Sequence, residues 1–354
     1  MKQIVLVLGT GLNERGWAKD FSQFGRVTLI QLGLMEHVEI WEKEQRIFSG
    51  PETKTDHTRP WDEAFLGLIS FFRTWQLLWK FSKETKIDLV VTGFYSSAFA
   101  VQLLRFLGKV RRTTFFLTDY LPPAGSWLVR LHRRITSRLV HLTAKWSDEA
   151  WLLSPRIPTV NPRSFVVPMH INTRPLPATN REEIGYIGNP SYDHALDILF
   201  AICKKHSFRL NIIGDSPYLQ SIKHLAPPDT RFHGLLNDEE KIGAIFANCF
   251  CGYAIYRNVS STSYSYYGFP SKTLYCFASN VPVVITSVAF FNENFEKRGV
   301  GRVVEPTPEA IEAAILQLKN NYAAYSQAID QFRTEWNAGA EAFHRERMSV
   351  LLND

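Results

Sequence analysis

At 354 residues the chain is longer than a typical domain of roughly 100–200 residues, which predicts two domains. Hydrophobic residues make up 45% of the chain and charged residues 21%, a globular composition that excludes a disordered protein. The net charge of +6 is too small to indicate a nucleic-acid partner unless the charge is concentrated in one segment.

The sequence gives no sign of a membrane span, a signal peptide or a metal-binding cysteine motif. No stretch reaches the roughly 18 consecutive apolar residues of a spanning helix, and the short N-terminal apolar run is interpreted as a first strand. The four cysteines have no repeated CxxC spacing, so neither a zinc site nor a disulfide framework is expected. We therefore expect a cytoplasmic protein, either free or peripheral at the inner face of the membrane.

The first half alternates short β-rich runs with helix-length segments, the pattern of βαβ units around a parallel sheet. The predicted strands are 3–9, 26–32, 87–92, 113–118, 149–153 and 164–167. The predicted helices are 16–24, 61–84, 96–108 and 126–145. These elements predict a first Rossmann-like domain over residues 1–170.

Residues 169–181 hold two prolines, two asparagines and two threonines, which indicates a linker. The alternation restarts after it and predicts a second Rossmann-like domain over residues 181–354. Its predicted strands are 184–188, 209–213, 231–234, 252–256, 282–285 and 302–304, with helices at 194–205, 217–225, 239–246, 272–278 and 308–319. Residues 322–352 have a helical pattern with no following strand, so this tail is expected to cross back to the first domain. The predicted fold class is α/β, with two Rossmann-like domains facing each other across a cleft.

Four loops of the second domain follow predicted strands, at the sheet edge where open α/β proteins bind ligands. Lys272 opens a helix, so its ammonium and the N–H groups of the first turn are candidates to hold a phosphate. Each glycine turn taken alone is also an ordinary strand-to-helix connection. The candidate phosphate-binding and donor-binding residues are Gly188, Asn189, Gly214, Asp215, Gly234, Leu235, Ser271 and Lys272.

Two loops of the first domain are expected to face the same cleft. Gly9, Thr10 and Gly11 follow the first strand, and Asp119 follows the strand that ends near residue 118. A carboxylate that accepts the proton of an acceptor hydroxyl must lie within hydrogen-bond reach of it, and Asp119 and Glu14 are the candidates. Asp119 is equally well interpreted as a helix cap.

Positive charge is concentrated between residues 127 and 146, where no acidic residue occurs. The basic residues there include Arg130, Arg133, Arg134, Arg138 and Lys145. A helix with these side chains on one side and leucines on the other fits an anionic membrane surface. It also fits a solvent-facing crossover helix whose apolar side covers the sheet.

The second half resembles the nucleotide-sugar glycosyltransferases of the GT-B fold, especially the large retaining group that builds bacterial polysaccharides and glycolipids. The resemblance lies in GYIGN (185–189), NIIGDSP (211–217), FHGLLNDEE (232–240), CGYAIYR (251–257) and GFPSKTLYCFASNVPVVIT (268–286). It implies a nucleoside diphosphate sugar as donor substrate, linked to uridine or guanosine, with no separate cofactor, and a glycan or lipid-linked acceptor. Arg257 then adds positive charge for the diphosphate, and because the chain has no Asp-x-Asp motif, no metal is expected.

The family usually has a glutamate that holds the donor ribose at the position of Tyr275, and a second glutamate at the position of Tyr267. Their replacement leaves two alternatives to transfer. One is a sugar-nucleotide epimerase of the same shape, and the other is a catalytically degenerate GT-B subunit that binds a ligand or a partner.

Overall fold

The computed structural model describes residues 1–9, 14–32, 35–50, 53–54, 62–117, 127–172, 181–236, 238–260, 263–268, 270–287 and 293–353. The chain divides into two compact units, one formed by Met1–His170 with Ala338–Asp354 and the other by Ile171–Asn337. Residues 338–353, which the sequence analysis included in the second domain, therefore belong to the first unit. Most of the predicted linker, residues 173–180, lies outside the described residues.

The first unit is built on a sheet with the order β4-β3-β2-β1-β6-β7-β8-β9, with β5 paired to β3. The strands are β1 (Lys2–Gly9), β2 (Gly25–Leu32), β3 (Met35–Glu42), β4 (Gln45–Ser49), β5 (Thr53–Lys54), β6 (Ile87–Thr92), β7 (Val110–Leu117), β8 (Glu149–Leu152) and β9 (Ser164–Val166). β1 pairs in parallel with β2 and β6, as expected for βαβ units. The central strands are buried because both faces of the sheet carry helices.

The antiparallel strands β3, β4 and β5 are absent from the sequence-based prediction. β3 runs antiparallel to β2 and to β4. The turn between β3 and β4 places Lys43 and Glu44 at positive φ, 47° and 65°. Such hairpin turns normally hold Asn-Gly or Asp-Gly, so a Lys-Glu turn gives little signal in the sequence.

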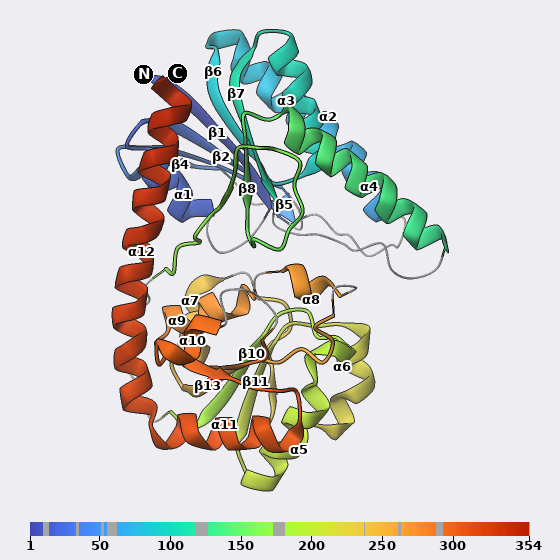
Figure 1. The fold of residues 1–354 in the computed structure, drawn as a ribbon, viewed down its shortest axis with the longest axis vertical. Coiled ribbons are helices and arrows are strands. Elements are labelled where there is room, and N and C mark those ends of the chain that lie inside the picture. The colour runs from blue at the N-terminus through green and yellow to red at the C-terminus, as the bar shows by residue number, and fades with distance from the viewer. Residues whose placement is uncertain are drawn as a thin grey trace. The chain divides into compact units, whose positions relative to one another are not determined.

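Helices cover both faces of the first sheet (Figure 1). α2 (Asp62–Glu84), α3 (Tyr95–Phe106) and α4 (Trp127–Trp146) lie on one side, whereas α1 (Glu14–Phe21) and the end of α12 (Tyr322–Asn353) lie on the other. Trp17 of α1 is buried against Trp151 of β8 and His344 of α12. The tail of the chain thus completes the core of the first unit, as its helical pattern without a following strand predicts.

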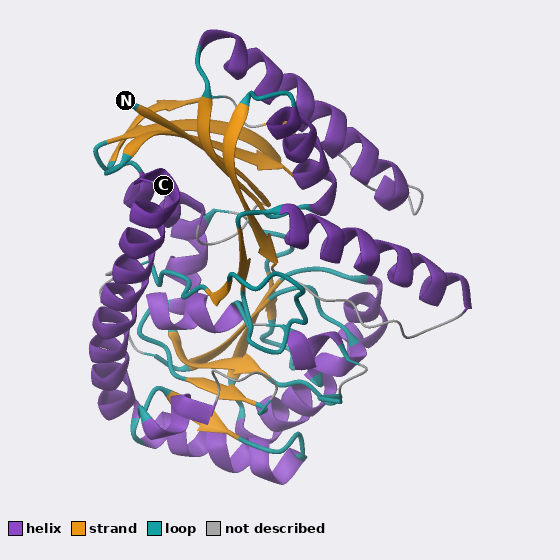
Figure 2. Cartoon of the chain, turned by 45° about the horizontal axis from the view of Figure 1, so that its top comes forward, coloured by secondary structure: helices purple, strands orange, loops and turns teal. Residues whose placement is uncertain are grey.

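The second unit has a parallel sheet with the order β12-β11-β10-β13-β14-β15, and Figure 2 shows the twist of its strands. The strands are β10 (Glu183–Ile187), β11 (Arg209–Ile213), β12 (Arg231–Phe232), β13 (Cys249–Ala254), β14 (Val283–Ile285) and β15 (Gly301–Val303). The helices are α5 (Leu196–His206), α6 (Pro217–Ile222), α7 (Glu239–Phe246), α8 (Tyr264–Tyr267), α9 (Lys272–Ala278), α10 (Glu293–Lys297) and α11 (Pro308–Asn320). β13 begins at Cys249, three residues before the predicted start at Gly252, and Cys249, Phe250 and Cys251 are fully buried in the sheet.

The strand order of the second unit reverses between β10 and β13, because the chain adds β11 and β12 on one side of β10 and β14 and β15 on the far side of β13. At such a reversal the loops after the two central strands lead to opposite faces and leave room for a ligand. The loops after β10 and β13 begin at Gly188 and near Tyr256. In the part of the chain that the structure describes, no helix is long and apolar enough to cross a membrane.

Candidate functional site

Three glycine turns of the second unit, at Gly188, Gly214 and Gly234, meet at the carboxyl ends of β10, β11 and β12. Gly188 N donates to Ile213 O at 3.0 Å, and Gly214 N donates to Gly234 O at 2.7 Å. Gly188 and Gly214 have φ values of 135° and 134°, which side chains rarely adopt. A Cβ at Gly214 would also overlap Gly188 O. The sequence motifs therefore form one backbone layer at the sheet edge.

Lys272, the first residue of α9, reaches this layer from the other side of the strand reversal. Its side chain is 9% exposed, and its buried Nζ has no hydrogen-bond partner among the residues that the structure describes. The ammonium lies between two aromatic rings, 4.9 Å from the centre of Tyr186 and 4.7 Å from that of Tyr256. A Cβ at Gly188 would lie 3.8 Å from Nζ, so the lysine head lies directly over the glycine turn.

The burial of Lys272 makes its charge unstable in the free protein. Desolvation lowers the pKa of Lys272 from the ordinary 10.5 to about 7. Contact with two ring faces compensates only part of the lost hydration of an ammonium. An anion beside Nζ would supply the missing partner, so the residue is suited to binding a phosphate.

His194 fixes the loop that follows β10. Its Nδ1 accepts from Ser191 N at 3.2 Å and lies 2.9 Å from the Tyr186 hydroxyl, so the ring proton is on Nε2. Burial, followed by the nearby Lys272 ammonium, lowers the pKa of His194 to about 3. The imidazole is therefore neutral at physiological pH, and it holds Tyr186 in place beside the lysine.

Arg257, which the family resemblance implies as added positive charge for the diphosphate, is engaged in an ion pair with Asp197, and its role at the donor stays a prediction. Its Nη2 donates to both carboxylate oxygens of Asp197, at 2.7 Å and 2.5 Å, and its Nη1 donates to Tyr192 O at 3.1 Å. The guanidinium also stacks 4.5 Å over the Tyr192 ring. Because Asp197 already neutralises it, Arg257 supports the loop after β10 rather than offering an open charge.

The other predicted donor residues surround this layer with less distinctive contacts. Asp215 is exposed and accepts from Ser216 N at 2.8 Å, which holds the turn before α6. Asn189 and Ser271 are exposed, and Leu235 is 67% exposed. Tyr275 lies one turn after Lys272 on α9 and is partly buried.

The predicted catalytic and acceptor-loop residues of the first unit lie in or beside segments that the structure does not describe. Gly9 ends β1 and Glu14 begins α1, but the side chain of Glu14 is not described. Thr10, Gly11 and Asp119 lie outside the described residues. Their roles stay predictions.

Sequence reasoning missed the three aromatic neighbours of Lys272, namely Tyr186, His194 and Tyr256. Tyr186 and Tyr256 stand within the quoted motifs GYIGN and CGYAIYR. A buried aromatic residue in or next to a strand is normally a core residue, so only the position of Lys272 between the Tyr186 and Tyr256 rings identifies their role.

Within the described residues, one group of potential metal ligands comes together, formed by Asp20, His170 and His344 in the first unit. Asp20 Oδ2 lies 2.6 Å from His170 Nε2 and 2.7 Å from His344 Nδ1. These are hydrogen-bond distances, and one carboxylate oxygen serves both rings. The group fits a buried polar link between α1, the end of the first unit's chain segment and α12.

Residues 181–321 match the family model described as Glycosyl transferases group 1. No curated protein sequence matches the chain.

Several solved structures share the fold of this chain, and each similarity extends over almost the full length of both proteins. Sucrose-phosphate synthase from Thermosynechococcus elongatus is 13% identical with a TM-score of 0.68, covering 99% of each chain. The UDP-forming trehalose-phosphate synthase from Burkholderia xenovorans is 12% identical with a TM-score of 0.63, covering 100% of this chain and 99% of its own. Anabaena HepE in complex with UDP-glucose is 11% identical with a TM-score of 0.61, covering 100% of each chain. The predicted two-domain GT-B fold is confirmed, and the predicted glycosyltransferase resemblance is confirmed over residues 181–321.

Proposed function

We propose, on the premise that residues 181–321 form a group 1 glycosyl transferase domain, that the protein transfers a sugar from a nucleoside diphosphate sugar to an acceptor hydroxyl. The observation that carries the proposal is the buried, unpartnered Nζ of Lys272 above the Gly188 turn, at the reversal of the strand order. A binding site for a diphosphate needs such a charge. The family match over residues 181–321 supports a sugar nucleotide as the ligand of this site.

In this proposal Lys272 stabilises the diphosphate as it leaves. Negative charge develops on the leaving group as the sugar–phosphate bond breaks, and a preorganised cation in a low-dielectric site is then most effective. Binding of the donor raises the pKa of Lys272, so the lysine is protonated when transfer occurs. Uridine and guanosine diphosphate sugars are the donors that the family resemblance favours.

Chemistry at the acceptor is assigned to the first unit. Asp119, with Glu14 as the second candidate, would accept the proton of the acceptor hydroxyl, and the loop of Gly9, Thr10 and Gly11 would line the acceptor position. The reaction would need no metal, because the positive charge of Lys272 would neutralise the negative charge of the diphosphate. The assignments of the base and of the acceptor loop rest on the position of these residues after strands of a parallel sheet.

We place the protein in the cytoplasm, at the inner face of the membrane, in the synthesis of a bacterial polysaccharide or glycoconjugate with a glycan or lipid-linked acceptor. Residues 127–146 would contact anionic lipid. If this segment were only a crossover helix whose apolar side covers the sheet, that side would be buried. Instead Trp127, Leu131 and Ile135 are 66%, 49% and 50% exposed. Exposed Arg130, Arg134 and Arg138 stand beside them.

The test is calorimetric binding of UDP, GDP and their glucose conjugates to wild type and to Lys272→Met. Lys319→Met is the matched control, because Lys319 in the same unit also lies over an aromatic ring, 4.6 Å from Phe208, but is exposed. We expect one nucleotide class to bind, Lys272→Met to bind about 10–100-fold more weakly, and Lys319→Met to bind as wild type. Equal affinity in both variants would remove Lys272 from the site.

Turnover then separates the three functions that share this fold. Release of free nucleoside diphosphate only after an acceptor is added supports transfer. Conversion of the sugar nucleotide without an acceptor indicates the epimerase. Binding without turnover across donors and acceptors indicates the degenerate subunit.

A further inference from the structure

We propose that the outer face of α3 and α4 in the first unit binds membrane phospholipid, with one acyl chain seated in an apolar cavity between the two helices. The proposal rests on the membrane-facing role proposed for residues 127–146 and adds a hydrocarbon site that the charge pattern does not predict. It is separate from the nucleotide site of the second unit.

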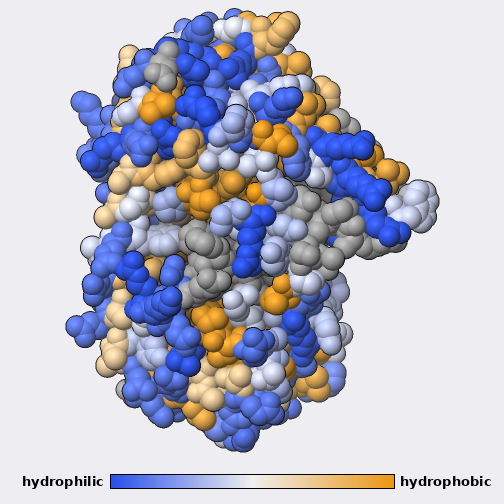
Figure 3. Space-filling model, in the orientation of Figure 1, coloured by the Kyte–Doolittle hydropathy of each residue, from blue (hydrophilic) through white to orange (hydrophobic). Residues whose placement is uncertain are grey.

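The exposed residues of α4 are divided into two strips along the helix. The first strip, called the cationic strip, consists of exposed residues that recur at helical spacing. It begins with Trp127 and continues with Arg130, Arg134, Arg138 and Lys145. Figure 3 shows this strip as a blue band over the position that α4 has in Figure 1, with apolar side chains at its outer edge.

An apolar strip adjoins the cationic one on the same outward face. It consists of Leu131, Ile135, Leu142 and Trp146, which are 49%, 50%, 36% and 46% exposed. Helices that lie in a membrane interface have such a basic side next to an apolar side. A helix that merely covers a sheet would turn these apolar residues inward.

α3 extends the apolar strip. Trp146 packs edge-on against Phe99 of α3, with ring centres 5.9 Å apart. Next to them Leu103, Phe106 and Leu107 are 47%, 90% and 51% exposed. A contiguous apolar surface of this kind on a soluble unit marks an interaction site.

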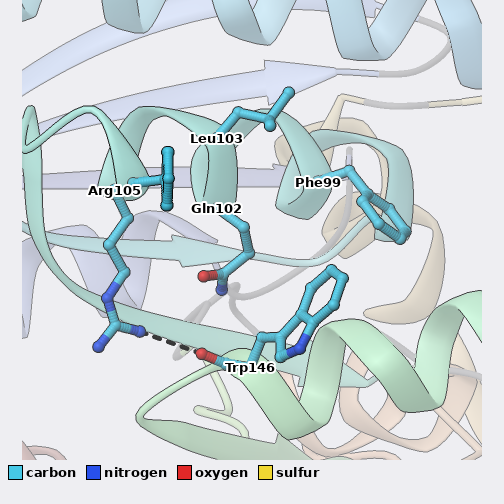
Figure 4. Close-up of a pocket in the computed structure, with 6 residues that line it drawn as sticks. Phe99, Gln102, Leu103, Arg105 and Trp146 are labelled. Atoms are coloured by element: carbon cyan, nitrogen blue, oxygen red, sulfur yellow. Dashed lines mark hydrogen bonds between the residues drawn. The ribbon is translucent and has the colours of Figure 1, made fainter.

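A cavity of about 550 Å³ opens in this surface, within the usual size range of small-ligand sites. Figure 4 shows its walls, with Phe99 and Trp146 at one end and Arg105 at the other. The lining residues are Phe99, Gln102, Leu103, Arg105, Phe106 and Trp146.

The two polar side chains that line the cavity donate their hydrogen bonds to other parts of the protein. Arg105 donates to Asp148 Oδ1 and to Trp146 O, both at 3.0 Å, and Gln102 donates to Thr113 Oγ1 at 3.0 Å. The cavity therefore offers mainly apolar walls, with its two donor side chains turned toward protein acceptors, which suits a hydrocarbon chain better than a sugar. The phospholipid headgroup would instead meet the cationic strip of α4.

The first experiment measures binding of lysophosphatidylglycerol below its micelle concentration to the full-length protein. Leu103→Trp fills the cavity yet keeps the surface apolar, and Leu107→Trp makes the same change at a similarly exposed position that does not line the cavity. We expect Leu103→Trp to weaken probe binding at least about tenfold, and Leu107→Trp to bind as wild type. Melting temperatures of the two variants check that both are folded.

The second experiment measures sedimentation with phosphatidylcholine vesicles, with and without phosphatidylglycerol. The variant Arg130→Gln/Arg134→Gln/Arg138→Gln should lose binding to the anionic vesicles, by roughly fivefold for each arginine removed. The same variant should still bind lysophosphatidylcholine, which has no net charge, in the cavity as well as wild type does.

Each outcome supports or overturns one proposal. Loss of vesicle binding in the arginine variant, with no uptake of either single-chain probe by wild type, would keep the membrane role and overturn the acyl-chain site. Equal probe binding by the two tryptophan variants would also overturn it. Nucleotide binding by these variants should equal that of wild type, so failure of the lipid proposal leaves the Lys272 site untouched.

Discussion

Replacement of Lys272 by methionine should stabilise the free protein while it weakens donor binding. Methionine keeps the volume of the lysine stem between the Tyr186 and Tyr256 rings but removes the buried charge. The pKa of Lys272 is lowered to about 7 from 10.5, and the corresponding cost at neutral pH is about 4 kcal/mol of folding free energy. Most of that cost should be recovered in Lys272→Met.

The lowered pKa of Lys272 also predicts how the stability of the wild type changes with pH. The unfolded lysine is protonated up to about pH 10.5, whereas the folded lysine loses its proton near pH 7, so the unfolded state binds more protons between these values. Stability of the wild type should therefore rise from pH 7 to pH 10.5. The advantage of Lys272→Met should shrink from about 4 kcal/mol at pH 7 to about 2 kcal/mol at pH 9.

Donor binding should reverse the effect of burial by supplying an anion beside Nζ. At pH 8 the free lysine is mostly neutral, so binding of a nucleoside diphosphate sugar should take up close to one proton. Calorimetry in two buffers of different ionisation enthalpy measures this uptake. UDP-glucose or GDP-glucose is the suitable ligand, because its diphosphate does not titrate near neutral pH.

Lys319→Met should change neither the proton uptake nor the pH dependence, because Lys319 is exposed. If Lys272→Met destabilises the free protein, or if the wild type binds donor without proton uptake at pH 8, the reasoning from burial is wrong.

Three further predictions concern other parts of the chain. Gly214→Ala should lower stability by at least about 2 kcal/mol in urea titrations, because its φ of 134° and the closeness of Gly188 O exclude a Cβ; a change below 0.5 kcal/mol would contradict this. Burial lowers the pKa of His344 despite its contact with Asp20, so stability should fall as the pH drops below about 6.5, and His344→Asn should flatten that dependence; an unchanged pH profile would count against it. Asp119→Asn should reduce transfer about 10²–10⁴-fold at an unchanged melting temperature, and near wild-type turnover would transfer the role of base to Glu14.

The sequence predicted the architecture because regular elements are encoded locally. Apolar spacing identified the parallel strands of both sheets, and the tail without a following strand indicated a helix that returns to the first unit. The antiparallel edge of the first sheet was missed although Val38 and Ile40 alternate with polar neighbours. Its Lys43-Glu44 turn lacks the residues by which hairpins are usually identified.

The electrostatic state of the site could not be read from the sequence, because it depends on elements far apart in the chain. Lys272 and Arg257 both looked like free cations at sheet-edge loops. The fold pairs Arg257 with Asp197, 60 residues away, and encloses Lys272 between rings from β10 and from the segment after β13. Motif position selected both residues, and the packing distinguishes them: within the described residues Arg257 has a carboxylate partner and Lys272 Nζ has none.

This difference between the two cations also bears on the missing family glutamates. Tyr275 lies three residues after Lys272 on α9, and residues at that spacing share one face of a helix. A glutamate there would place an anion near the lysine and favour its protonated form without any ligand. With tyrosine in its place, Lys272 has no nearby carboxylate on its own helix, and its pKa falls to about 7. The loss of the ribose carboxylate therefore does not by itself indicate a loss of function, because it leaves the diphosphate as the counter-ion that the lysine lacks.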